Sequence, residues 1–101
     1  MKIFDWDEKK NQELKAERDI CFEDILIAIV EDRLLDIVKH PNPKRYGNQK
    51  IFILDVNNYA YLVPFVEIED EISLKTIIPC RKATKKYLID KDKEEKWNIL
   101  I

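Results

Sequence analysis

Apolar residues recur at helical spacing in the first third of the chain. The repeat lies at i, i+3, i+4, i+7 and i+8 and predicts a helix with a broad apolar face against the core. Its members are Phe22, Ile25, Leu26, Ile29 and Val30. Residues 7–18 are rich in helix formers, with Asp5 or Asp7 as caps, but apart from Leu14 they carry little that is apolar. We expect a surface helix there, preceded by a short strand or extended segment over residues 1–6.

Apolar and polar residues alternate later in the chain, and the composition becomes typical of strands. The predicted strands cover residues 34–40, 50–56, 59–66 and 72–79. Asn57 and Asn58 connect two of them, and because Asn tolerates positive φ, we expect a tight antiparallel hairpin. Pro64 has no N–H to donate, which favours an edge or bulged position in its strand.

These elements predict an α+β fold with two N-terminal helices, a twisted four-stranded antiparallel sheet covered on one face, and a C-terminal helix. That last helix is expected over about residues 81–90. Residues 1–90 then form a single domain, and residues 91–101 form a charged tail with an apolar end. The tail can dock on the domain itself or on a partner, because its apolar end is costly to leave in water.

Composition and charge limit the function. With 46% hydrophobic residues and one glycine in 101 residues, the chain can bury a core. Its 20 acidic and 18 basic residues argue against a strong non-specific nucleic-acid binder, which needs a broad basic face. Any RNA contact must be local, and two stretches suit it: residues 37–50 contain no acid, and residues 81–91 hold five bases and one acid.

The remaining composition excludes several classes of site and location. Cys21 and Cys80 lie far apart without metal-binding spacing, so neither a metal site nor a disulfide framework is expected. No stretch has the apolar core of a signal peptide or the length of a membrane span. We therefore expect a cytoplasmic protein without membrane contact.

Three stretches resemble the BrnT family of bacterial toxin ribonucleases, whose fold is similar to that of RelE-type toxins. They are FDWDEKK at residues 4–10, ICFEDI at 20–25 and, most specifically, TIIPCRKATKKY at 76–87. The likeness spans most of residues 3–90. It implies a type II toxin that cleaves RNA without metal or cofactor, the substrate's own 2′-hydroxyl attacking the adjacent phosphate. It also implies an antitoxin partner that has a DNA-binding ribbon-helix-helix portion and a segment that covers the toxin's basic groove.

The resemblance also assigns site residues and shows one departure. Arg81 matches the family's arginine at the mouth of the sheet and can grip phosphate bidentately, unless it is a plain surface arginine. The family's first helix ends in Lys-His-Gly, where this chain has Glu17, Arg18 and Asp19. We expect Glu17 to form an ordinary exposed pair of little energetic value, whereas Arg18 either joins that pair or stabilises charge in catalysis.

Other candidates follow from the residues themselves. Arg45, with Lys44 and Tyr46, lies in an acid-free loop that can close over RNA, with the Tyr46 ring stacking on a base; a solvated turn is the alternative. His40 is the only side chain expected to titrate near neutrality unaided, although a histidine before proline at a strand end is more often structural. The predicted catalytic residues are thus Arg81, Arg45, His40 and Arg18. The predicted RNA-binding residues are Lys44, Tyr46, Lys82, Lys86 and Tyr87, while Lys85 suits a solvated helix face.

Two other functions compete with the ribonuclease. The acidic balance and the altered end of the first helix favour a catalytically inactive protein-binding module with the same fold. The apolar end of the tail favours a regulatory domain that forms homo-oligomers through it. Measured RNA cleavage separates the first rival from the ribonuclease, and sedimentation of tail-truncated protein tests the second.

Overall fold

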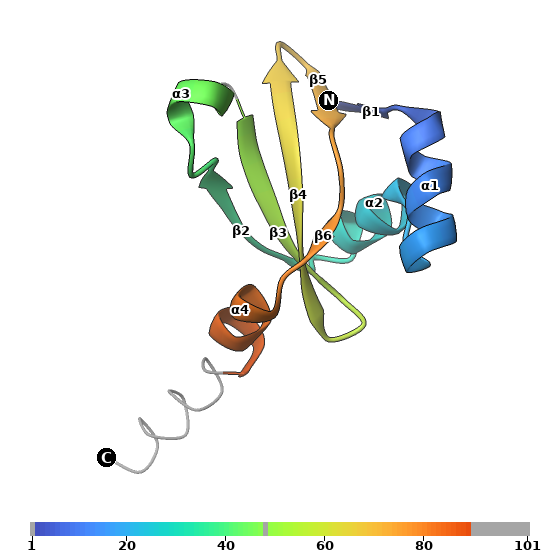
Figure 1. The fold of residues 1–101 in the computed structure, drawn as a ribbon, viewed down its shortest axis with the longest axis vertical. Coiled ribbons are helices and arrows are strands. Elements are labelled where there is room, and N and C mark those ends of the chain that lie inside the picture. Colours follow the sequence, from blue (N-terminus) through green and yellow to red (C-terminus); the bar gives the residue numbers. More distant parts are fainter. Residues whose placement is uncertain (1, 48, 90–101) are drawn as a thin grey trace.

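A computed structural model describes residues 2–47 and 49–89, with only the backbone described at Pro43 and Tyr46 (Figure 1). Its α+β class agrees with the prediction. The helices are α1 (Glu8–Arg18), α2 (Phe22–Val30), α3 (Pro43–Tyr46) and α4 (Arg81–Thr84), and α4 continues as a π-helical turn, η1 (Lys85–Ile89). The strands are β1 (Ile3–Trp6), β2 (Leu34–Lys39), β3 (Gln49–Val56), β4 (Tyr59–Ile68), β5 (Glu71–Leu74) and β6 (Ile78–Pro79). The predicted tail over 91–101 lies outside the described residues.

The helix starts and the hairpin follow the local signals in the sequence. Asp7 caps α1 by accepting a hydrogen bond from the backbone N–H of Lys9 at 3.1 Å. The Asp24 carboxylate accepts one from the N–H of Cys21 at 3.0 Å at the start of α2. Asn57 and Asn58 have φ of 55° and 65°, so both adopt the left-handed conformation that a two-residue hairpin turn needs. The predicted cap at Asp7 and the predicted hairpin at Asn57 and Asn58 are confirmed.

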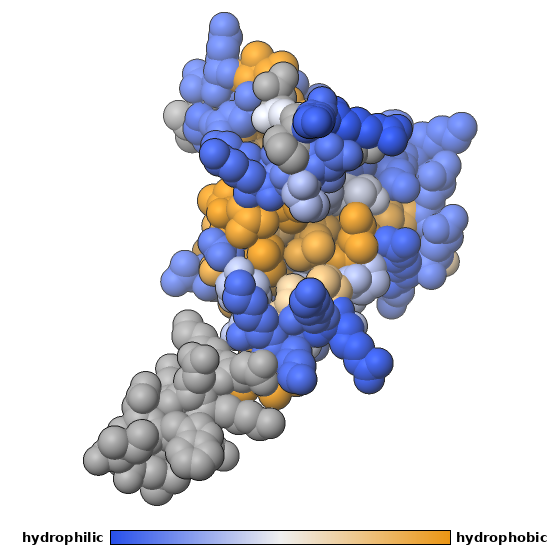
Figure 2. Space-filling view, turned by 60° about the vertical axis from the view of Figure 1, so that its left-hand side comes forward, coloured by the Kyte–Doolittle hydropathy of each residue, from blue (hydrophilic) through white to orange (hydrophobic). Residues whose placement is uncertain are grey.

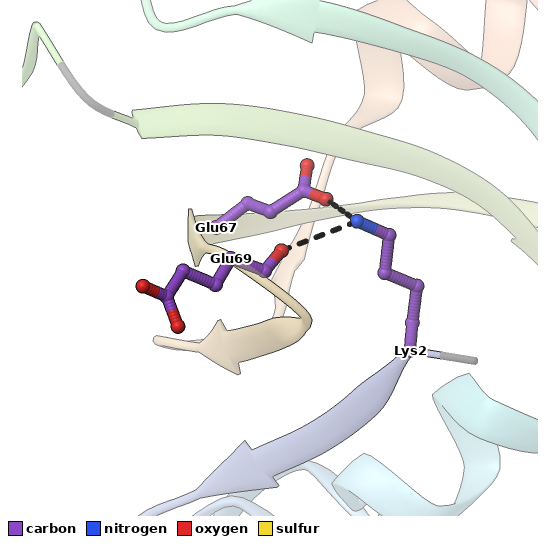
Figure 3. Close-up of polar contacts among 3 residues, drawn as sticks. All are labelled: Lys2, Glu67 and Glu69. Atoms are coloured by element: carbon purple, nitrogen blue, oxygen red, sulfur yellow. Dashed lines mark hydrogen bonds and ion pairs between the residues drawn. The ribbon is translucent and has the colours of Figure 1, made fainter.

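The sheet has more strands than predicted and is mixed. Its order is β1-β5-β4-β3-β2, with β6 also paired to β4. β1 runs parallel to β5, and the N–H of Ile3 donates to the carbonyl of Asp70 at 2.7 Å. Lys2 extends this junction, because its ammonium contacts the Glu67 carboxylate and lies 3.3 Å from the Glu69 carbonyl oxygen (Figure 3). The prediction of four antiparallel strands is therefore wrong.

The predicted strand over residues 72–79 divides into β5 and β6, and Pro64 gives the physical reason. The Pro64 carbonyl accepts a hydrogen bond from the N–H of Lys75 at 2.9 Å. In a strand the nitrogen and the carbonyl oxygen of one residue point to the same side, so the proline nitrogen faces this segment without a hydrogen to donate. The ladder is interrupted there and resumes at β6, where Leu62 pairs with Ile78. Pro64 thus lies at an interruption, not at the edge or bulge that the sequence favours.

Helices cover both faces of the sheet, so the expectation of one covered face is also wrong. On one face α1 and α2 enclose the larger core, in which Phe22 is fully buried and its ring stacks on Trp6 with centroids 5.6 Å apart. The alternating residues Ile51 and Ile53 point to the opposite face. They pack there with Ala83 of α4 and with side chains of η1. Seen from the β2 side, apolar side chains gather across the middle of the molecule, with hydrophilic ones above and below (Figure 2).

One threonine anchors α4 to the sheet. The Thr84 hydroxyl accepts a hydrogen bond from the N–H of Ala60 at 2.9 Å and donates one to the carbonyl of Cys80 at 2.8 Å. The N–H of Cys80 in turn donates to the carbonyl of Ala60 at 3.0 Å. The start of α4 is therefore fixed beside the β3–β4 hairpin, which sets the position of Arg81.

Candidate nucleic-acid interface

The predicted site residues divide between the two ends of the sheet. The N–H of His40 donates to the carbonyl of Gln49 at 3.2 Å, at the start of β3. Arg81 instead follows Cys80, whose N–H is bonded to the carbonyl of Ala60. Ala60 pairs with Asp55, which lies six residues after Gln49 along β3. At about 3.4 Å per residue, the position beside His40 and the position beside Arg81 are about 20 Å apart along β3. Figure 1 shows α3 and α4 at opposite ends of the sheet.

At the α4 end, Arg81 lines a groove of about 580 Å³ that we call the Tyr59 groove. The residues lining it are Tyr59, Arg81, Thr84, Lys85 and Ile89. Two cations thus lie beside an aromatic ring, and in the described part of the chain no carboxylate lines this groove. Arg81 and Lys85 are exposed and Tyr59 is half-buried. Guanidinium and ammonium groups bind phosphate, and an accessible aromatic ring stacks on a base.

Arg18 lies near this groove but has a structural bond. Its guanidinium donates from Nη1 to the carbonyl of Ile77 at 2.5 Å, which ties the end of α1 to the segment before β6. Arg81 lies four positions after Ile77, so their Cα atoms are at most about 14 Å apart. The structure therefore brings Arg18 and Arg81 to the same end of the sheet. Glu17, the residue before Arg18, is exposed on the last turn of α1.

The candidates on the last helix differ in how accessible they are. Tyr87 donates from its hydroxyl to Asp36 Oδ2 at 2.7 Å, which raises the pKa of Tyr87 and lowers that of Asp36. Its ring packs against the second core cluster, and Lys86 Nζ lies 5.2 Å from the ring centroid. This position suits a residue that fixes η1 to β2 better than one that stacks on a base. Lys82 is exposed one residue after Arg81.

The opposite end of the sheet carries the other predicted group. Asn42 caps α3, its side chain accepting from the N–H of Arg45 at 3.4 Å, and His40 Nδ1 accepts from the N–H of Asn42 at 3.1 Å. Lys44 and Arg45 are exposed on this short helix. Tyr46 ends the helix, and its side chain lies outside the description. The imidazole thus lies with Lys44 and Arg45, not with Arg81.

The sequence reading missed Tyr59 and Tyr61. Their ring centroids are 5.7 Å apart with planes tilted by 50°. The sequence feature that could have identified them is their spacing of two residues just after the hairpin, which places both rings on one face of β4. Tyr61 also lines a second cleft, of about 460 Å³, between the end of α1, the start of α2 and the hairpin. The Tyr59 groove and this second cleft are therefore each lined by a tyrosine ring and by cationic side chains, and the two rings are in contact.

The fold and this surface define an α+β domain with a basic, aromatic surface at the end of the sheet where the β3–β4 hairpin lies. Comparisons with models of protein families, with curated proteins and with solved structures found no match. Across residues 2–47 and 49–89, no cluster of three or more His, Cys, Asp or Glu side chains is placed to hold a metal ion. No helix in the same part of the chain is long and apolar enough to span a membrane.

Proposed function

We propose that this chain is a toxin ribonuclease of the kind that its resemblance to the BrnT family implies, and that it binds RNA at the Tyr59 groove. The observation that carries the proposal is the joint lining of one groove by Arg81, Lys85 and Tyr59. Single-stranded RNA is recognised by cations that track its backbone and by rings that stack on its bases. The groove offers both in a protein with a net charge of −2, so the contact is local.

Arg81 has the central role in this proposal. Its planar guanidinium grips two oxygens of a phosphate and stabilises the charge that develops when the 2′-hydroxyl attacks. Lys85 neutralises a neighbouring part of the backbone, and Tyr59 holds a base by stacking. Thr84 positions Arg81 indirectly, because its two hydrogen bonds fix α4 against β4.

A second candidate is the catalytically inactive binding module with the same groove. One observation favours it: among residues 2–47 and 49–89, neither a carboxylate nor an imidazole lines the Tyr59 groove, and His40 lies at the other end of the sheet. General acid and base groups contribute about 10² to 10⁴-fold to such a reaction, so a site without them cleaves slowly. In both cases a protein partner covers the groove. For the toxin this is a ribbon-helix-helix antitoxin, and both proteins act in the bacterial cytoplasm.

The proposal is tested by measuring the binding affinity and the cleavage rate of a labelled single-stranded RNA with the wild type and with variants of the groove. Arg81→Ala should weaken binding at least about tenfold, because charged hydrogen bonds to phosphate are lost. Tyr59→Leu should weaken it by about tenfold through lost stacking. Lys9→Ala, which removes an exposed charge near the start of α1, is the neutral control.

The location of binding is tested by Arg45→Ala, which removes an arginine at the other end of the sheet. If Arg45→Ala weakens binding and Arg81→Ala does not, the RNA lies at α3 and the proposed site is wrong. Binding at the groove without cleavage by the wild type selects the inactive module over the ribonuclease.

A further inference from the structure

The second cleft adjoins the Tyr59 groove through the ring contact between Tyr59 and Tyr61. We call it the Arg33 cleft. Lys15 of α1, Arg33, which precedes β2, and Asn57 of the hairpin are among the residues that line it. Residues distant in sequence thus bring two cations to a hollow large enough for a phosphate group.

The guanidinium of Arg33 is incompletely bonded. Its Nη2 atom contacts Glu31 Oε1 at 2.6 Å, whereas Nε is buried and has no hydrogen-bond partner among residues 2–47 and 49–89. A buried donor without an acceptor is unfavourable, and structures usually satisfy such groups with protein, water or a ligand. The Arg33 side chain as a whole is 32% exposed, so an anionic oxygen in the cleft can accept hydrogen bonds from the accessible part of its guanidinium and from the Lys15 ammonium.

Two acidic side chains also line the cleft, and they differ in the hydrogen bonds that they form. The Asp24 carboxylate accepts hydrogen bonds from the N–H of Cys21 at 3.0 Å and from its thiol at 3.3 Å, so it belongs to the cap of α2. Asp19 is exposed at the end of α1, in a left-handed conformation with φ of 55°. Asp19 is therefore the charge that opposes an anion in this cleft, and its removal breaks no side-chain bond among residues 2–47 and 49–89.

We propose that the Arg33 cleft binds the phosphate of a second nucleotide, adjacent to the one held in the Tyr59 groove. This inference rests on the proposed function, since it extends the same RNA strand from Arg81 past Tyr59 and Tyr61 to Lys15 and Arg33. The RNA then crosses the end of the sheet at which the β3–β4 hairpin lies. A dinucleotide fits in the Tyr59 groove alone, and a longer strand gains affinity from the cleft.

The test compares a uridine dinucleotide with a uridine hexanucleotide in binding titrations at several salt concentrations. Lys15→Gln should weaken hexanucleotide binding about fivefold and lower the salt slope by about one, because one phosphate contact is lost. Asp19→Asn should tighten hexanucleotide binding severalfold, and asparagine tolerates the left-handed backbone. Neither change should alter dinucleotide binding.

The matched control is Glu69→Gln, which removes one negative charge from another exposed left-handed position, with φ of 56°, in the β4–β5 turn. If Asp19→Asn and Lys15→Gln behave like this control while Arg81→Ala weakens both RNAs, the cleft is not on the RNA path and the inference is wrong. If the wild type binds neither RNA, the proposed function fails, and the inference with it. Melting curves of each variant confirm that the fold is intact.

Discussion

Replacing Asn11 with alanine should destabilise the fold by about 2 kcal/mol. Asn11 is 3% exposed and is the buried polar residue that joins α1 to α2. Its side-chain oxygen accepts from the N–H of Phe22 at 2.7 Å, and its amide donates to Glu23 Oε1 at 2.7 Å. The first bond satisfies an N–H in the first turn of α2 that has no partner within the helix.

The magnitude follows from what the substitution leaves behind. Phe22 is fully buried, so its N–H loses its acceptor where water does not replace it, which costs about 1–3 kcal/mol. Glu23 is exposed, so water largely restores its lost hydrogen bond. Alanine regains roughly 0.5 kcal/mol through its higher helix propensity. For a domain of this size the net loss lowers the melting temperature by about 10 °C.

Thermal melting followed by circular dichroism checks this prediction. The control is Gln12→Ala at the next position, where an exposed bond from Gln12 to Glu8 at 2.8 Å is lost. It should change stability by less than about 0.5 kcal/mol. A second variant, Asn11→Asp combined with Glu23→Gln, reverses donor and acceptor and should recover most of the stability. Equal melting temperatures for Asn11→Ala and Gln12→Ala would refute the reasoning.

Two more predictions concern titratable groups. Because the hydrogen bond from Tyr87 lowers the pKa of Asp36 in the folded state, this carboxylate stabilises the fold above its unfolded pKa, about 3.9, and the contribution is lost as the pH falls through the folded value. Tyr87→Phe should raise the pKa of Asp36 toward its usual value in an NMR titration of its carboxyl carbon; an unchanged pKa would exclude this bond as the cause. Burial raises the pKa of the Cys21 thiol, so iodoacetamide should modify Cys21 more slowly in the native protein than in urea at pH 8, measured by mass spectrometry. Equal rates would show that the thiol is not shielded.

The local features of the fold were accessible from the sequence. The Asp7 cap and the Asn57–Asn58 hairpin depend on side chains within a few residues of the backbone that they serve, so composition and spacing suffice to find them. The parallel pairing of β1 with β5 joins residues nearly 70 positions apart, as in Ile3 with Glu71, and no local pattern specifies it. The interruption at Pro64 required knowing which neighbour the proline nitrogen faces.

The candidate site was predictable only in its parts. Charge patterning indicated both basic stretches, and the resemblance singled out Arg81. The sequence could not show that β3 separates His40 from Arg81, because their relation depends on the register of β2, β3 and β4. Nor did it show that Tyr59 and Tyr61 join the basic groups, since alternating tyrosines in a strand also suit a core.

The most direct test of the central claim is to induce the wild-type chain in a bacterial host without its neighbouring gene, and to follow growth and RNA integrity. Arg81→Ala, Arg45→Ala and Lys9→Ala are induced in parallel, each with soluble protein confirmed. The account predicts growth arrest and RNA loss with the wild type and Lys9→Ala, and neither effect with Arg81→Ala. Normal growth and stable RNA with soluble, folded wild-type protein would contradict it and leave the inactive binding module as the function of this fold.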